Sequence, residues 1–170
     1  MIVQLQYAGT NSTEEANISK TSKQELPLKK HGWQFNWRQM SRKKGALLFK
    51  LTQVASPNVI EAMLMLTILN GEMVYMNAIE LAPHNYGSNG TFSNAAGIML
   101  GYACLKSFQL GKGHYRGYAS FDSKTKLIQL YETKYGAIRA MGQKMFFDDY
   151  AGQALIKRYL KLDNDDRYKS

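Results

Sequence analysis

Cysteine is nearly absent from this 170-residue sequence, which contains only Cys104. A single cysteine excludes an internal disulfide and a zinc site built from several cysteines. Cys104 stands at helical spacing from Leu100 and Phe108, so we expect a small core residue rather than a nucleophile. The three histidines are scattered without metal-ligand spacing, and no metal site is predicted.

Long apolar runs are also missing. The longest lies near residues 62–69 and is too short to span a bilayer. The first residues, MIVQLQYAGT, lack the basic region and long apolar run of a targeting segment. We therefore expect a cytoplasmic protein that does not bind a membrane.

Acidic side chains are scarce, with 13 Asp and Glu against 22 Lys and Arg, and the net charge is +9. The excess is concentrated in residues 1–50, which hold nine basic and three acidic side chains. A positive surface favours anionic partners, and both nucleic acid and a phosphorylated cofactor qualify. For any single lysine, a solvated surface position is the simpler interpretation.

The length suits one domain with one substantial core, so residues 1–170 are predicted to form a single domain. Residues 2–7 alternate as a half-buried strand does. Residues 8–24 are polar without a clear period and, like the tail 163–170, are expected to be exposed or flexible. In WQFNWRQM, residues 33–40, the aromatic side chains alternate with polar ones, which predicts a strand. Its aromatic face either covers the core or, less favoured, stacks nucleobases.

Residues 46–53 read as another strand. Residues 59–69 and 73–82 flank Asn70-Gly71, the strongest short hairpin signal, which predicts that they pair as antiparallel strands. The second strand leads through a loop, residues 83–93, into an amphipathic helix over residues 94–110 that Gly111 ends. Small residues at the start of a helix leave backbone N–H groups free, which makes a phosphate site.

The helix is a crossover, so the strand predicted at residues 114–121 should lie parallel to residues 73–82. A helix over residues 124–134 follows, with Leu127, Leu130 and Tyr131 on one face, and Gly136 ends it. Residues 137–141 and 143–147 form a hairpin around Gly142, and a last helix extends to about residue 160. The fold class is α/β (α+β), with one mixed, antiparallel-rich sheet and helices on its faces.

The order of elements from about residue 46 to 147 resembles the GNAT-type N-acetyltransferases. Their R/Q-x-x-G-x-G/A motif corresponds to TFSNAAG, residues 91–97, in which Ala96 fits and Thr91 and Asn94 depart from the family pattern. Their N-x-x-A-x-x-L-Y-x-x-x-G-F motif corresponds to KTKLIQLYETKYGA, residues 124–137, in which Leu130-Tyr131 match. The segments W-x-F-N-W, ELAPHN and SF-x-x-KTKL-I-x-x-Y resemble a bacterial branch of this superfamily.

This resemblance implies acetyl-CoA as the acyl donor and assigns roles to particular residues. The backbone N–H groups of Asn94, Ala95, Ala96 and Gly97 would bind the pyrophosphate. The backbone of Ile79 and Leu81 would hold the pantetheine arm, and Ser123 and Lys124 would contact CoA phosphates or pantetheine amides. Tyr131 would protonate the departing thiolate, and Glu80 is a candidate general base, with His84 a weaker second candidate.

Each of these residues also has a purely structural interpretation. The small residues let the helix lie close on the sheet, Glu80 is ion-paired or exposed, Tyr131 is a core tyrosine, and Lys124 is solvated. The favoured function is an acetyl-CoA-dependent N-acetyltransferase in which an amine attacks directly. The alternatives are a non-catalytic acyl-CoA-binding or protein-interaction module and, less favoured, a nucleic-acid-binding protein. The amine acceptor is not identified, a homodimer is left open, and specificity is expected from residues 1–45 and 83–93.

Overall fold

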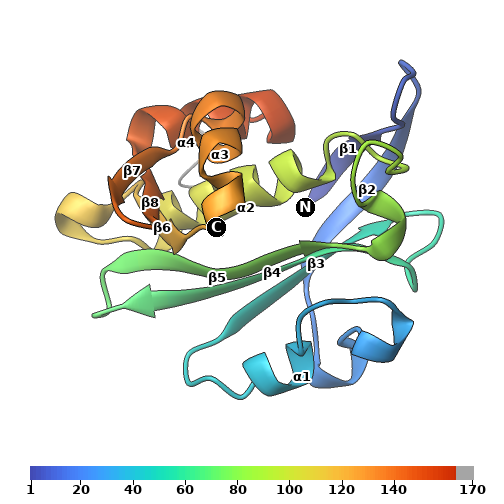
Figure 1. Cartoon of the computed structure of the whole chain (residues 1–170), viewed down its shortest axis with the longest axis horizontal. Coiled ribbons are helices and arrows are strands. Elements are labelled where there is room, and N and C mark those ends of the chain that lie inside the picture. The colour runs from blue at the N-terminus through green and yellow to red at the C-terminus, as the bar shows by residue number, and fades with distance from the viewer. Residues whose placement is uncertain (164–170) are drawn as a thin grey trace. The chain divides into compact units, whose positions relative to one another are not determined.

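The computed structural model describes residues 1–163 and has the predicted mixed fold, a mostly antiparallel sheet flanked by helices (Figure 1). The strands follow one another across the sheet in the order β1-β2-β3-β4-β5-β6-β8-β7. They are β1 Ile2–Gln6, β2 Thr13–Lys20, β3 Leu47–Gln53, β4 Ile60–Leu69, β5 Met73–Leu81, β6 Ala119–Asp122, β7 Ile138–Met141 and β8 Lys144–Phe147. The helices are α1 Trp37–Met40, α2 Ala95–Leu110, α3 Ile128–Tyr135 and α4 Asp149–Leu155, which continues as a π-helix over Ile156–Leu160.

The chain divides into two compact units. The first contains Met1–Met65 and Ala78–Met99, and the second contains Leu66–Asn77 and the chain from Leu100 onward. Strands β4 and β5 and helix α2 each contribute residues to both units. Residues 164–170, which include most of the tail predicted to be flexible, lie outside the described residues.

Part of the polar segment 8–24 in unit 1 forms a strand that the sequence pattern did not predict. Thr13–Lys20 form β2, which pairs antiparallel with β1 on one side and β3 on the other. Only Ala16 and Ile18 of this strand are fully buried. The other residues of this strand are polar, and two apolar residues at alternate positions are too few to indicate a strand.

The aromatic segment at residues 33–40 is also not a strand. Asn36 caps α1, because its side-chain oxygen accepts a hydrogen bond from the Gln39 N–H at 3.1 Å. Trp33 and Trp37 are four residues apart and are 7% and 0% exposed. Both pack in a core cluster with Met63, Met65 and Ala78 of β4 and β5, so this segment covers one face of unit 1 (Figure 1).

The hairpin signal at Asn70-Gly71 is confirmed. Asn70 and Gly71 both have positive φ, at 52° and 73°, and the Glu72 N–H closes the turn by donating to the Leu69 carbonyl at 3.0 Å. Two central residues with positive φ make the turn type that suits the twist of a hairpin. The adjacent strands β4 and β5 are therefore antiparallel, as predicted.

In unit 2, β5 and β6 are parallel neighbours, and the crossover prediction is confirmed. The strand predicted at residues 114–121 is correct only in its second half, because Gly113–Tyr115 form a 3-10 turn and β6 begins at Ala119. Positive φ at Gly117, 88°, turns the chain inside the segment for which the sequence pattern indicated extended backbone.

The remaining elements of unit 2 match the sequence closely. A 3-10 turn, Thr125–Leu127, precedes α3, and Gly136 ends this helix with φ of 74°. Leu130 is 43% exposed, so it does not share the inward face on which it was expected. Strands β7 and β8 form the predicted hairpin, and Asp148 caps α4 by accepting from the Ala151 N–H at 2.8 Å.

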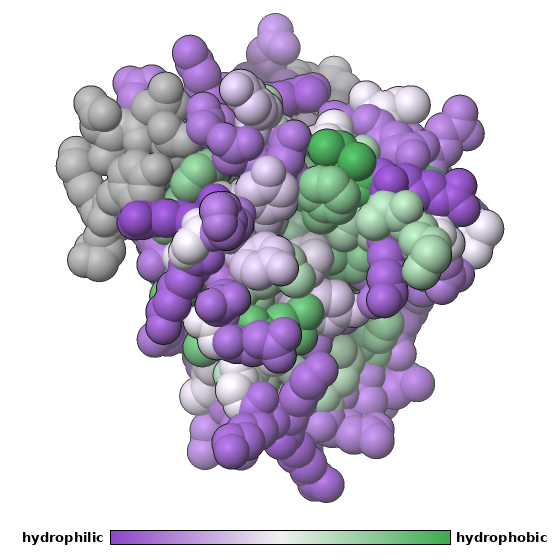
Figure 2. All heavy atoms as spheres, turned by 90° about the vertical axis from the view of Figure 1, so that its left-hand side faces the viewer, coloured by the Kyte–Doolittle hydropathy of each residue, from purple (hydrophilic) through white to green (hydrophobic). Residues whose placement is uncertain are grey.

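The surface mixes hydrophilic side chains with exposed apolar ones. Figure 2 shows apolar surface between hydrophilic side chains on the face that it presents. All four residues of the edge strand β7 are exposed, and Met141 at its end is 74% exposed. None of the helices formed by residues 1–163 is long and apolar enough to cross a membrane.

Candidate functional site

The start of α2 is fastened to the first strand of unit 1. The Asn94 side chain accepts a hydrogen bond from the Gln6 N–H and donates one to the Gln4 carbonyl, both at 2.9 Å. The Ser93 N–H donates to the Gln6 carbonyl at 2.9 Å, also on β1. The Asn94 side chain therefore positions the helix, and the predicted phosphate contact would have to come from its backbone.

The first helical bond runs from the Ile98 N–H to the Asn94 carbonyl at 2.9 Å. The N–H groups of Ala95, Ala96 and Gly97 precede it and have no hydrogen-bond partner within residues 1–163. Ala95 and Gly97 are buried, and Ala96 is half-buried. Three free donors at the positive end of a 16-residue helix form an arrangement that binds phosphate.

The edge of β5 also has free backbone. Strand β6 pairs with Val74, Tyr75 and Met76, and no strand pairing on that edge extends to Ile79 or Leu81 in the described chain. Both side chains are half-buried and alternate with the buried Glu80. Their peptide groups are thus available to an extended, amide-containing ligand such as a pantetheine arm.

Glu80 lies in the interior of unit 1 and accepts four hydrogen bonds. Its Oε1 accepts from the Gln34 N–H at 2.5 Å and the Tyr86 hydroxyl at 2.7 Å. Its Oε2 accepts from the Trp37 indole N–H at 2.7 Å and the Phe35 N–H at 3.2 Å. The carboxylate therefore ties the aromatic segment to β5, and this structural role was not foreseen. Burial, followed by the bond to Glu80 and its charge, raises the pKa of Tyr86, which stays a donor.

A second buried carboxylate, Glu61 of β4, is 0% exposed. Its Oε1 accepts from Gln53 Nε2 at 2.8 Å, and its Oε2 contacts Asn85 Nδ2 at 2.8 Å and His84 Nε2 at 2.5 Å. The His84 side chain is 43% exposed. Sequence reasoning noticed His84 from its loop position but missed Glu61, which is 23 residues away and has no local signal.

Three predicted site residues, Ser123, Lys124 and Tyr131, lie in unit 2, and Lys124 is exposed. Ser123 is buried; its N–H donates to the Gln143 carbonyl at 2.9 Å and its hydroxyl to the Lys124 carbonyl at 3.0 Å. Tyr131 is half-buried, with its ring centroid 4.8 Å from that of Phe121. Burial raises the pKa of Tyr131, so its phenol keeps its proton at neutral pH.

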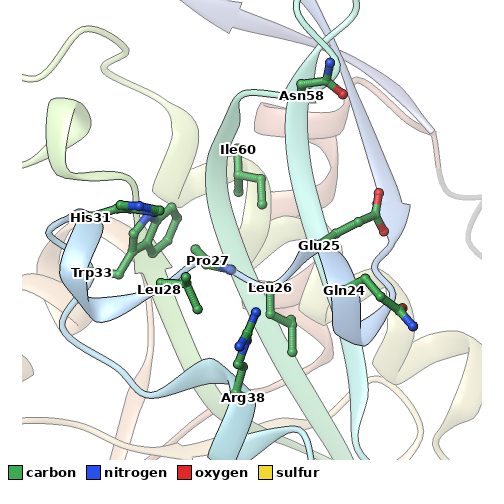
Figure 3. Close-up of a pocket in the computed structure, with 10 residues that line it drawn as sticks. All are labelled: Gln24, Glu25, Leu26, Pro27, Leu28, His31, Trp33, Arg38, Asn58 and Ile60. Carbon is green, nitrogen blue, oxygen red and sulfur yellow. The ribbon is translucent and has the colours of Figure 1, made fainter.

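A cavity of about 350 Å³ lies in unit 1 (Figure 3). Its walls come mainly from residues 24–38, with Asn58 and Ile60 completing them. Leu26 and Trp33 supply apolar wall, while Arg38 extends from α1 toward Leu26 and Pro27 (Figure 3). This cavity falls in the stretch from which acceptor specificity was expected.

Cys104 is buried, as predicted, and burial raises the pKa of its thiol, which keeps it protonated. Within residues 1–163, no three His, Cys, Asp or Glu side chains gather in a way that would hold a metal ion.

Comparisons with known proteins identify the fold. No protein-family model matches the sequence, and no curated protein matches it. Among solved structures, AtaTR bound with AcCoA has a TM-score of 0.61 at 11% identity, covering 82% of this chain and 97% of that one. The KacTA–DNA complex has a TM-score of 0.58 at 7% identity, covering 84% and 99%. A mutant spermidine N-acetyltransferase SpeG from Vibrio cholerae has a TM-score of 0.56 at 11% identity, covering 81% and 95%.

The chain therefore has the GNAT-type N-acetyltransferase fold that its motifs predicted. At identities of 7–11%, this likeness concerns the fold alone, and the reaction has to be argued from the residues of this chain.

Proposed function

We propose that this protein is an acetyl-CoA-dependent N-acetyltransferase, in which an amine attacks the thioester carbonyl directly. The observation that carries the proposal is the start of α2. There, the N–H groups of Ala95, Ala96 and Gly97 are free, and their small side chains allow a pyrophosphate to approach the backbone. The neighbours that contain AcCoA or are named as acetyltransferases support the choice of ligand.

Different residues of the chain would bind the cofactor and transfer the proton. The α2 N-terminus would bind the pyrophosphate, and the peptide groups of Ile79 and Leu81 would hydrogen-bond the pantetheine arm. Tyr131, a protonated phenol, would return a proton to the departing thiolate. Ser123 and Lys124 stay candidates for contacts to the cofactor. Glu80 fits a positioning role better than that of a base, because all four of its hydrogen bonds already come from the protein.

Acceptor recognition is assigned to the cavity of residues 24–38. It combines apolar wall with charged groups, which suits a small molecule or peptide end rather than a flat surface. Glu25 at this cavity is ion-paired with Lys50, which lowers its pKa to about 2 with help from Ser22. This carboxylate is therefore ionised at neutral pH, with Lys50 and Ser22 as its hydrogen-bond donors.

The nucleic-acid alternative loses its main support. It relied on stacking by Trp33 and Trp37, and both rings are buried in the core cluster. A non-catalytic acyl-CoA-binding module stays the alternative to an enzyme, and the same experiment separates the two.

The test begins with calorimetric titration of acetyl-CoA. Ala96→Glu places a carboxylate in the first turn of α2, where it favours the helix but repels a phosphate. We expect binding to weaken at least tenfold in Ala96→Glu and to be nearly unchanged in Ala96→Gln, which matches its size without the charge. Equal affinities in the two variants, or no binding by the wild type at millimolar ligand, would refute the proposal.

Catalysis is then measured as CoA release from acetyl-CoA with spermidine, an amino acid amide and a tripeptide as acceptors. Turnover with any of them supports the enzyme, and Tyr131→Phe should reduce turnover without changing acetyl-CoA affinity. Tight binding without release across this panel favours the binding module.

A further inference from the structure

Two buried glutamates lie on the same face of β4 and β5, and they have different partners. Glu80 accepts only from two backbone N–H groups, an indole N–H and a phenol hydroxyl, and no histidine is among its partners. Glu61 instead contacts the imidazole of His84, a type of side chain that acts as a general base in enzymes. The hydrogen bonds of Glu80 are explained by its structural role, whereas the contact between Glu61 and His84 suggests a function.

The hydrogen bonds around Glu61 indicate which ring nitrogen of His84 faces it as a donor. Asn85 is fixed in orientation, because its Oδ1 accepts from the Phe92 N–H at 3.1 Å and its Nδ2 therefore faces Glu61 Oε2. The same oxygen contacts His84 Nε2, and a carboxylate can only accept, so Nε2 carries the hydrogen. In the neutral ring, the Nδ1 atom of His84 is then left with a lone pair, and it has no hydrogen-bond partner within residues 1–163.

The half-exposed ring of His84 makes that lone pair accessible, while its partner Glu61 is 0% exposed. Such an arrangement, with a buried carboxylate holding one ring nitrogen and an outer nitrogen free, fixes the tautomer of a histidine base and stabilises the imidazolium that forms. The backbone of His84 is tied to the end of its loop, because the Thr91 N–H and hydroxyl both donate to the His84 carbonyl, at 3.0 and 3.3 Å.

The place of His84 in the chain connects it to the proposed cofactor site. It follows the end of β5 by three residues, and Thr91, its backbone partner, precedes the start of α2 by four. These are the two elements to which the proposed function assigns the pantetheine arm and the pyrophosphate.

We infer that His84 is the general base that deprotonates the acceptor and that Glu61 is its positioning residue. This inference rests on the proposed acetyl transfer. An acceptor ammonium gives one proton to His84 Nδ1, and the neutral amine then forms the N–C bond to the thioester carbonyl. As the C–S bond breaks, the nitrogen loses a second proton and the thiolate gains one, so the products are the acetamide, free CoA thiol and one proton released to solvent.

The kinetic test uses His84→Gln, which keeps a polar side chain at a half-exposed position. We expect kcat with a competent amine from the panel to fall about 100-fold, with acetyl-CoA affinity unchanged. Imidazole in the buffer should restore part of the turnover of His84→Ala. His114→Ala, an exposed histidine of unit 2, is the matched control and should turn over like the wild type.

Glu61→Gln tests the positioning role. We expect a reduced kcat at unchanged KM for the acceptor, and Glu61→Asp should recover part of it. If the buried substitution prevents folding, the His84 variants decide the question by themselves. Wild-type turnover in His84→Gln would overturn the inference while leaving the acetyltransferase proposal intact.

A second readout does not need turnover. Diethyl pyrocarbonate modifies accessible, unprotonated imidazole nitrogens, and mass spectrometry locates the modified histidine. We expect His84 to react and bound acetyl-CoA to protect it, while His114 reacts equally with and without the cofactor. Modification of His84 that saturating acetyl-CoA leaves unchanged would overturn the inference, whereas failure of acetyl-CoA to bind at all would instead overturn the proposed function.

Discussion

At the scale of single residues, the most consequential finding is that both buried carboxylates of unit 1 are fully hydrogen-bonded. Glu80 was predicted as a base from its place on β5, and that assignment stays untested. Its donors at Gln34, Phe35 and Trp37 lie 43–46 residues earlier in the chain. No local pattern could have indicated them, because hydrogen bonds over that separation exist only after folding.

Replacing Glu80 by Gln should therefore mainly affect stability. An amide turns an N–H₂ group toward donors and removes the charge that strengthens four hydrogen bonds, so we expect a loss of about 3 kcal/mol in the free energy of unfolding. Urea denaturation followed by tryptophan fluorescence measures it. Glu132→Gln, at an exposed position of α3, is the control and should change stability by less than about 0.5 kcal/mol; a similar small change for Glu80→Gln would mean that the carboxylate does not anchor the aromatic segment.

At the scale of elements, local sequence signals predicted the structure correctly where a turn or helix end requires a particular backbone conformation. Asn70-Gly71 and Gly136 were read correctly, because positive φ is a property of a few residue types. The strand predicted at residues 33–40 was wrong, because the spacing of Trp33 and Trp37 fits both the alternation of a strand and the four-residue period of a helix. The capping side chain of Asn36 and the anchor at Glu80 decided between these two.

The end of α2 provides a test of close packing. A Cβ at Gly111 would lie 2.4 Å from the Ser107 carbonyl oxygen and 2.8 Å from that of Tyr115. Because both atoms are backbone, the chain has to shift, and Gly111→Ala should destabilise the protein by about 3 kcal/mol or more. Thermal unfolding of Gly113→Ala gives the comparison: its Cβ has open space, and a φ of 53° alone costs about 1 kcal/mol. A loss in Gly111→Ala no larger than that in Gly113→Ala would show that crowding at Gly111 adds no cost.

At the scale of the whole molecule, ionisation of buried tyrosines should limit stability in alkali. Burial raises the pKa of Tyr75, Tyr102 and Tyr135 to about 12 each, against 10.0 for an exposed phenol, and the bond to Asp122 contributes for Tyr75. A folded pKa above the unfolded one gives stability that is complete below pH 10 and is lost as the pH rises toward 12.

Phenolate absorbance at 295 nm and circular dichroism, recorded together against pH, measure this loss. We expect ionisation of the buried phenols and unfolding to coincide between about pH 10 and 12. Tyr135→Phe should move the transition to higher pH, whereas Tyr150→Phe, at a position 79% exposed, should not. Phenolate formation completed near pH 10, ahead of unfolding, would contradict the effect of burial.

Oligomeric state belongs to the same scale. The homodimer stays a prediction, and the exposed apolar residues of β7 are compatible with it. Light scattering after size-exclusion chromatography measures the mass directly against the 19.3 kDa chain.

The sequence by itself determined the order of the central elements: the hairpin of β4 and β5, the crossover through α2, and the parallel neighbour β6. These follow from hydrophobic period, turn chemistry and the short-range rules of chain connection, which act over a few residues. These short-range signals were enough to predict the fold and the free N–H groups at the start of α2.

Only the tertiary structure decided what the polar residues do. It showed that the Asn94 side chain holds the start of α2 to β1, that Glu80 anchors the aromatic segment, and that His84 contacts Glu61. A side chain's chemistry depends on which partners reach it, and these partners come from distant parts of the chain. The α2 N-terminus could be predicted from the sequence because a helix carries its own dipole and free donors. The sequence offered His84 only as a second candidate base, and its contact with the buried Glu61, which motivates the proposed role, depends on the tertiary fold.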